Sequence, residues 1–270
     1  MDVIYYLVRE GNCMIMCDYV EEFKKTIKKG AFKKYIDEGC ELNKETELDV
    51  YCAAIYQGYL DACRTFRSGN TLNKDDERVK KLAFLMKSYI DAPFGEKFDH
   101  NKYCNTLIGN GLMTYGQAQK IVNMAFKYLY CLVDIYDIHN DIEEKFDDCH
   151  MPLDGIMLTW IYRNILDDTG ENKSKMGTWS NMSYSDTNDV DEEGHYTYNF
   201  YVKIINSYCD KKCTTPLQMD FENWREMSLI LAAEEFIKAF DGNKIKKNQN
   251  LEYLLDQIQS IVMASQFIDE

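Results

Sequence analysis

The sequence predicts an all-α protein, with residues 1–270 forming a single helical domain of two packed lobes. Only three prolines occur among the 270 residues, far below the usual share of about 5%, and this scarcity favours long helices. Apolar side chains recur at helical spacing along most of the chain. They make up 46% of the residues, which is enough to bury a full core. Any β-sheet is expected to be a minor one near the N-terminus.

The first third of the chain contains two predicted helices. Residues 3–16 fit either a strand or a helix, and the pattern leaves both open. Residues 43–67 carry apolar side chains mostly at helical spacing, and the Ser-Gly-Asn sequence at 68–70 closes this helix. A second helix is predicted to begin at the N-cap Asn73, with acidic residues in its first turn, and to end at Pro93.

The next stretch is unusual in its charge. From His100 to Val133 the chain contains no Asp or Glu, although 45 of the 270 residues are acidic. Three lysines, at positions 102, 120 and 127, lie inside this stretch. On a chain of net charge −14, a region spared from negative charge predicts a local electropositive site. Chance combined with a buried helix is the alternative explanation, and the sequence leaves it open.

Within this stretch, residues 107–116 form a glycine-containing turn that leads into an amphipathic helix. Its glycines are Gly109, Gly111 and Gly116. Such a turn offers unpaired backbone N–H groups and the positive end of a helix dipole, which suit an anion such as a phosphate. We therefore expect these glycines, together with Lys127 on the following helix, to contact phosphate groups at one localised place.

Three further helices are predicted after residue 150. Pro152 begins a helix that extends to about Asp167, because proline is preferred in the first helical turn. Thr215 and Pro216 repeat this signature ahead of another apolar segment, and Asn250 opens the last helix.

Residues 169–195 form a polar loop that is too long for an ordinary connection. The loop is either a disordered insertion or a working loop. Trp179 is out of place in a pure linker, because an aromatic side chain in such a segment packs back on the body or stacks on a ligand. Both roles stay open for Trp179.

Composition argues against several classes of protein. The ten cysteines form no C-x-x-C pair and the four histidines share no metal-ligand spacing, so no structural metal is expected. No apolar stretch has the length of a membrane span and the N-terminus does not resemble a signal peptide, so we expect no membrane partner and a cytoplasmic protein. The net charge argues against general coating of nucleic acid, while a localised DNA contact remains compatible with it.

Two short segments resemble the helix-hairpin-helix motif of the DNA base-excision glycosylases. The first is LIGNG at 107–111 followed by QAQKIVN at 117–123, and the second is MPLDG at 151–155, which is similar to the family's later Pro-x-Asp. The segments resemble in particular those of the 8-oxoguanine DNA glycosylases, including the archaeal class, and the resemblance covers about residues 100–167. Five residues separate LIGNG from QAQK, where the family's hairpin passes almost directly into its helix.

The resemblance implies an all-helical pair of lobes with an active site between them. It also implies that Lys120 takes the nucleophile position and attacks the sugar, and that Asp154 supports the positive charge that develops there. Gln117, Trp160 and Trp179 are the side chains expected to contact an extruded base. No cofactor is implied, apart from a monovalent cation at the hairpin. Ordinary structural roles, a solvated lysine face and a helix-start acid, also fit Lys120 and Asp154.

Three functions therefore stay open. The first is a DNA glycosylase, with or without lyase activity, that acts on a damaged or modified base, with Lys127 as the second choice of nucleophile. The second is a catalytically inactive helical module that binds nucleic acid or nucleotide. The third is an acidic helical interaction protein with a basic partner. Convergence of the Lys120 and Asp154 side chains in a cleft is the observation that would favour the first.

Overall fold

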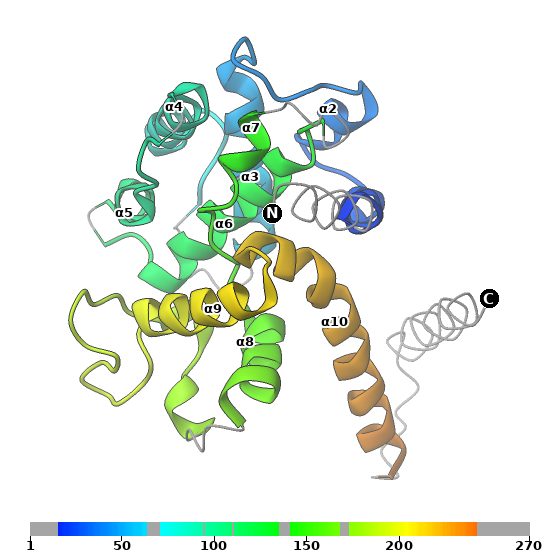
Figure 1. Cartoon of the computed structure of the whole chain (residues 1–270), viewed down its shortest axis with the longest axis vertical. Helices are drawn as coiled ribbons and strands as arrows, with labels where there is room; N and C mark the ends of the chain where they lie inside the picture. The colour runs from blue at the N-terminus through cyan, green and yellow to red at the C-terminus, as the bar shows by residue number, and fades with distance from the viewer. Residues whose placement is uncertain are drawn as a thin grey trace, which may run out of the picture. The chain divides into compact units, whose positions relative to one another are not determined.

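The computed structural model of the chain is mostly helical, which confirms the all-α fold class (Figure 1). It describes residues 16–63, 71–93, 95–109, 111–134, 141–167 and 173–241. The predicted opening segment, apart from Met16, and the predicted helix after Asn250 lie outside these residues. The chain divides into two compact units, Met1–Phe221 and Glu222–Glu270. The arrangement as two packed lobes stays a prediction.

The helices follow one another along the whole described chain. A helical segment at residues 16–26 comes first. The α-helices after it are α2 (Lys33–Asp37), α3 (Leu48–Ala62), α4 (Glu77–Asp91), α5 (His100–Ile108), α6 (Tyr115–Tyr130), α7 (Asp141–Glu144), α8 (Gly155–Ile161), α9 (Tyr198–Lys212) and α10 (Pro216–Asp241). Shorter helical segments lie at Tyr162–Leu166, Lys173–Met176 and Trp179–Asn181. Among the described residues there is no strand, and one isolated bridge pairs Val190 with Tyr196.

Three helices begin later than the sequence predicts. The side chains of Asn43 and Asn73 each accept a hydrogen bond from the amide two residues ahead, so they form turns and do not cap α3 and α4. Asp76 caps α4 instead. The third case is α8. The sequence predicts that it begins at Pro152, but its N-cap is Asp154. N-cap residue types also favour turns, and this competition shifts each start by about one helical turn.

Helix α6 is buried along almost its whole length, and this burial explains the acid-free stretch. Of the sixteen residues of α6, fourteen are buried. The helix packs against α3 and α5, and α5 in turn packs against α4, which lies beside it in Figure 1. At Gly58 of α3 a Cβ atom would come within 2.7 Å of the Ile121 carbonyl oxygen, so glycine permits the close approach of α3 to α6. Because an unpaired buried carboxylate is costly, α6 excludes acids. Burial therefore accounts for the lack of acids in α6, which forms about half of the stretch.

The polar loop predicted at 169–195 is folded against the body from residue 173 onward. Backbone amides of Tyr196, Thr197 and Tyr198 donate to the carbonyl oxygens of Lys175, Asp189 and Ser183. The Tyr201 hydroxyl donates to the Met176 carbonyl oxygen. These bonds tie both ends of the loop to α9, which positions Trp179 beside α6.

Within the described residues, no helix is both long and apolar enough to cross a membrane. None of the nine cysteines that the structure describes forms a disulfide, and six of them are buried. They therefore act in the fold mainly as small apolar side chains.

Candidate active site

The side chains of Lys120 and Asp154 meet where α6 passes the start of α8. The distance between Lys120 Nζ and Asp154 Oδ2 is 3.2 Å, and each side chain is 11% exposed. The two residues are far apart in sequence, so the ion pair depends on the fold. The structure thus brings together the two residues that the resemblance assigns to the chemistry.

Asp154 is oriented by the helix that it caps. Its Oδ1 atom accepts hydrogen bonds from the amides of Ile156, at 2.9 Å, and Met157, at 3.0 Å. Its Oδ2 atom is therefore left to face Lys120. The carboxylate makes charge-assisted hydrogen bonds on both oxygens, which hold it in one orientation.

Two buried amide side chains of α6 hold the segment before Asp154. Gln119 Nε2 donates to the Leu153 carbonyl oxygen at 2.8 Å, and the Leu153 amide donates back to Gln119 Oε1 at 3.2 Å. One turn later, Asn123 Nδ2 donates to the Met151 carbonyl oxygen at 3.0 Å. Both amide side chains are fully buried. This clamp fixes the extended segment along α6 and so determines where Asp154 lies relative to Lys120.

Behind the clamp lies a buried cluster of His100, His150 and Tyr198. His100 Nε2 lies 2.7 Å from Asn123 Oδ1, and the Tyr198 hydroxyl lies 2.9 Å from His150 Nδ1. The two imidazole rings stack at 4.3 Å between centroids. Burial lowers the pKa of His100 well below its ordinary value and lowers the pKa of His150 to about 4. Both imidazoles are therefore neutral at pH 7.

This cluster predicts an acid-sensitive fold. Because the folded chain resists protonation of His100, the unfolded chain binds one more proton as the pH falls below about 6.5. As the pH falls below 6.5, the free energy of unfolding therefore decreases by about 1.4 kcal/mol per pH unit on account of this histidine. Between pH 6.5 and 5, we expect the free energy of unfolding of His100→Gln to fall less steeply than that of the parent, by about 1.4 kcal/mol per pH unit. Urea unfolding at several pH values measures this. Parallel pH curves for the parent and the variant would contradict this.

Trp179 covers Lys120. The Lys120 ammonium lies 4.8 Å from the centre of the indole ring. The segment that carries Trp179 is attached to the start of α6, because the Gly116 amide donates to the Met182 carbonyl oxygen at 2.9 Å and the Thr114 hydroxyl donates to that of Ser180. A Cβ atom at Gly116 would lie 1.9 Å from the Trp179 carbonyl oxygen. Gly116 is thus required for the close approach of this segment.

The amides of the three glycines in the turn donate to backbone carbonyl groups, which differs from the expectation that they are unpaired. The amides of Gly109 and Gly111 donate to the carbonyl oxygens of Asn105 and Ile108, so they end α5. Both glycines have positive φ, at 52° and 79°. The Gly116 amide is bonded to Met182. A phosphate would have to displace these backbone bonds.

Three more predicted side chains serve the fold. Gln117 forms a capping box with Thr114 and does not face an open site. Trp160 packs edge-on against Tyr208 at 5.7 Å between ring centroids and is 8% exposed. Lys127 is 2% exposed and paired with the buried Asp220, so it neither contacts DNA phosphates nor competes with Lys120 as nucleophile.

The sequence reasoning missed Gln119 and Asn123. Asn123 shares a face of α6 with Lys120 and Lys127, and a polar row of this kind is usually solvated. The absence of acids around that row is the signal that could have marked it as buried.

No metal centre accompanies this site. Within the ranges that the structure describes, no group of three or more His, Cys, Asp or Glu side chains could hold a metal ion. The monovalent cation at the hairpin stays a prediction. No protein-family model, no curated protein and no solved structure matches the chain.

Proposed function

We propose that the protein is a DNA base-excision glycosylase, with lyase activity, that acts on a damaged or modified base. The observation that carries the proposal is the pair of Lys120 and the helix-capping Asp154, 3.2 Å apart and almost enclosed. An amine and a carboxylate held together in this way suit displacement at a sugar carbon. The acid-free stretch is not used to support the proposal, because burial of α6 accounts for the lack of acids in its second half.

The proposed reaction begins once Lys120 has lost its proton. The neutral amine attacks C1′ of the sugar, the bond from C1′ to the base breaks, and its electron pair leaves with the base, which takes up a proton. Asp154 stabilises the positive charge that develops on the sugar. The attacking nitrogen then loses a proton, and opening of the bond from C1′ to O4′, with proton uptake at O4′, gives a Schiff base. Elimination of the 3′ phosphate after loss of a C2′ proton is the lyase step.

In this proposal Trp179 forms the wall against which the extruded base stacks. Its indole already lies over the Lys120 ammonium, where the sugar and base have to enter. Base–aromatic stacking contributes about 1–3 kcal/mol. Of the three side chains expected to contact the base, Trp179 is the one that lies beside the ion pair.

Borohydride trapping tests the proposal. The probes are a duplex and a single strand, each carrying either 8-oxoguanine or an abasic site. An abasic aldehyde reports on the lysine whichever base the enzyme recognises. We expect the parent to form a covalent complex with at least one probe, because borohydride reduces the Schiff base to a stable amine. Lys120→Ala is expected to abolish trapping.

The matched control is Lys102→Ala, which removes an exposed lysine from the same stretch of the chain. This variant should trap as the parent does. Thermal unfolding establishes that Lys120→Ala is folded. Equal trapping by Lys120→Ala and the parent would refute the assignment of the nucleophile.

A binding module without chemistry is the second candidate function. The observations that favour it are that the Trp179 indole covers the Lys120 ammonium and that Asp154 already occupies the other side of this ammonium as its ion-pair partner. A parent protein that binds the probes but is trapped on none of them would make this the better description.

A further inference from the structure

The strongest local positive charge on the chain lies in residues 24–34. This segment, KKTIKKGAFKK, holds six lysines and no acidic residue, on a chain whose net charge is −14. Four of these lysines are exposed, at positions 25, 28, 29 and 34. Since the glycine turn and Lys127 are engaged inside the fold, this segment is considered as a place where several exposed cations lie together with no acidic residue between them in the sequence.

The segment is fixed to the core by its apolar residues. Ile27 is 6% exposed and Phe32 is fully buried. The Phe32 ring packs against Tyr128 of α6 at 5.3 Å between centroids. Gly30 has a φ of 120°, and its Cα packs so closely on Gln57 of α3 that a Cβ atom would lie 1.9 Å from Gln57 Oε1. The lysines between these anchors are therefore carried on a defined turn.

The lysines of the segment divide into two groups. Lys24 pairs with Glu21 at 2.7 Å, and Lys33 pairs with Asp37 at 2.5 Å. In the part of the chain that the structure describes, no ion pair involves the group formed by Lys25, Lys28 and Lys29. Their charge is consequently available to an external anion.

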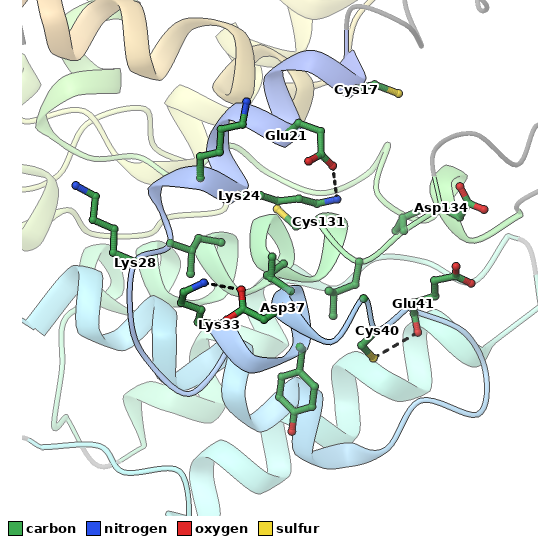
Figure 2. A pocket seen from close by; sticks show the side chains of 17 residues that line it. Cys17, Glu21, Lys24, Lys28, Lys33, Asp37, Cys40, Glu41, Cys131 and Asp134 are labelled. Atoms are coloured by element: carbon green, nitrogen blue, oxygen red, sulfur yellow. Dashed lines mark hydrogen bonds and ion pairs between the residues drawn. The ribbon is translucent and has the colours of Figure 1, made fainter. Parts of the chain in front are cut away.

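Two of these lysines, Lys25 and Lys28, line a hollow of about 810 Å³. Figure 2 shows Lys28 extending away from the opposite edge of the hollow, where Glu41 and Asp134 lie. The two edges thus carry opposite charge. An extended anion is favoured along the lysine edge and disfavoured across the hollow.

We infer that Lys25, Lys28 and Lys29 form the surface that binds the phosphate backbone of DNA, an inference that rests on the proposed function for the identity of the polyanion. Phe32 contacts α6 at Tyr128, which follows Lys120 by eight residues and so by about 12 Å along the helix axis. That distance corresponds to about three to four nucleotides of one strand.

The test measures binding of undamaged DNA as a function of salt. Fluorescence anisotropy with an undamaged duplex is recorded between about 25 and 200 mM salt. In this range phosphate contacts contribute most of the affinity. The triple variant Lys25→Gln, Lys28→Gln and Lys29→Gln removes the three charges. We expect the logarithmic salt slope to decrease in magnitude by about 2 to 3, because each lost phosphate contact removes about 0.9.

A matched triple variant controls for the change in net charge. Lys74→Gln, Lys80→Gln and Lys81→Gln removes three exposed lysines at and near the start of α4 and makes the chain equally more acidic. This control should keep the slope of the parent. An unchanged slope in the 25/28/29 variant, or an equal loss in the control, would overturn the inference.

The inference and the proposed function fail in different ways. Trapping by the parent, together with an unchanged slope in the 25/28/29 variant, rejects only the inference. If the 25/28/29 variant has a smaller salt slope but the parent is not trapped by borohydride, the inference is supported and the proposed glycosylase reaction is rejected. If the parent binds neither duplex nor single-stranded DNA at about 25 mM salt, the low end of the titration, both the inference and the proposed function are rejected.

Discussion

Lys127→Met is expected to lower the free energy of unfolding by about 3–5 kcal/mol, the range for breaking a buried ion pair by removing one partner. Lys127 Nζ lies 2.5 Å from Asp220 Oδ2, and the two side chains are 3% and 1% exposed. Phe23 and Phe221 enclose the ammonium, with ring centres at 4.2 and 4.5 Å. Loss of the lysine would leave the Asp220 carboxylate buried among aromatic rings with no opposite charge beside it.

A double variant separates loss of the pair from loss of packing. Lys127→Met with Asp220→Leu removes both charges, and we expect it to recover most of the stability that either single change loses. Burial raises the pKa of Asp220, so in Lys127→Met alone the carboxyl can take up a proton, and the deficit should shrink as the pH is lowered toward 5. Urea unfolding of the three variants at pH 7 and pH 5 measures both effects. Additive losses in the double variant would contradict this account of the pair.

Helical periodicity predicted the fold class but not which face of a helix is buried. The stripe that contains Lys127 and Asn123 on α6 has the spacing of a solvated face, yet both side chains are buried. Periodicity shows that a stripe is polar. Whether it meets water or the polar groups of another segment depends on distant residues, here Asp220 and the backbone near Leu153.

The pair of Lys120 and Asp154 could be predicted from the sequence because the resemblance supplied both residues. The residues that position the pair could not. Gln119 acts through hydrogen bonds to the backbone of Leu153, which any residue type provides, so no motif marks its partner. Trp179 stood out by composition, but its place over Lys120 depends on backbone bonds to Gly116 and Thr114.

The glycines illustrate why a phosphate-binding turn is hard to recognise in a sequence. Gly109 and Gly111 are required for positive φ at the end of α5, and Gly116 for the approach of the Trp179 segment. A turn that binds an anion requires glycine for the same reasons. A structural turn and an anion-binding turn differ in what their backbone amides bind. In this chain the glycine amides donate to backbone carbonyl oxygens.

Asp154→Asn is expected to slow base release by about 100-fold or more, the loss that follows removal of one electrostatic stabiliser of a transition state, while DNA binding stays near that of the parent. Asparagine still accepts the amides of Ile156 and Met157, because it is as good an N-cap as aspartate. What it lacks is the negative charge that faces Lys120. That charge matters most when the sugar becomes cationic, so its loss reduces the rate constant more than it reduces affinity.

Comparison with Asp154→Ala separates the charge from the cap. Alanine removes both and costs about 1 kcal/mol of stability through loss of the N-cap, whereas asparagine should unfold near the parent temperature. A purely structural role for Asp154 predicts that asparagine releases the base at the parent rate and that alanine alone is impaired. A catalytic role predicts that both variants are slow although only alanine is destabilised. Single-turnover base release, the dissociation constant for the same duplex and the melting temperature, measured on all three proteins, decide between the two roles.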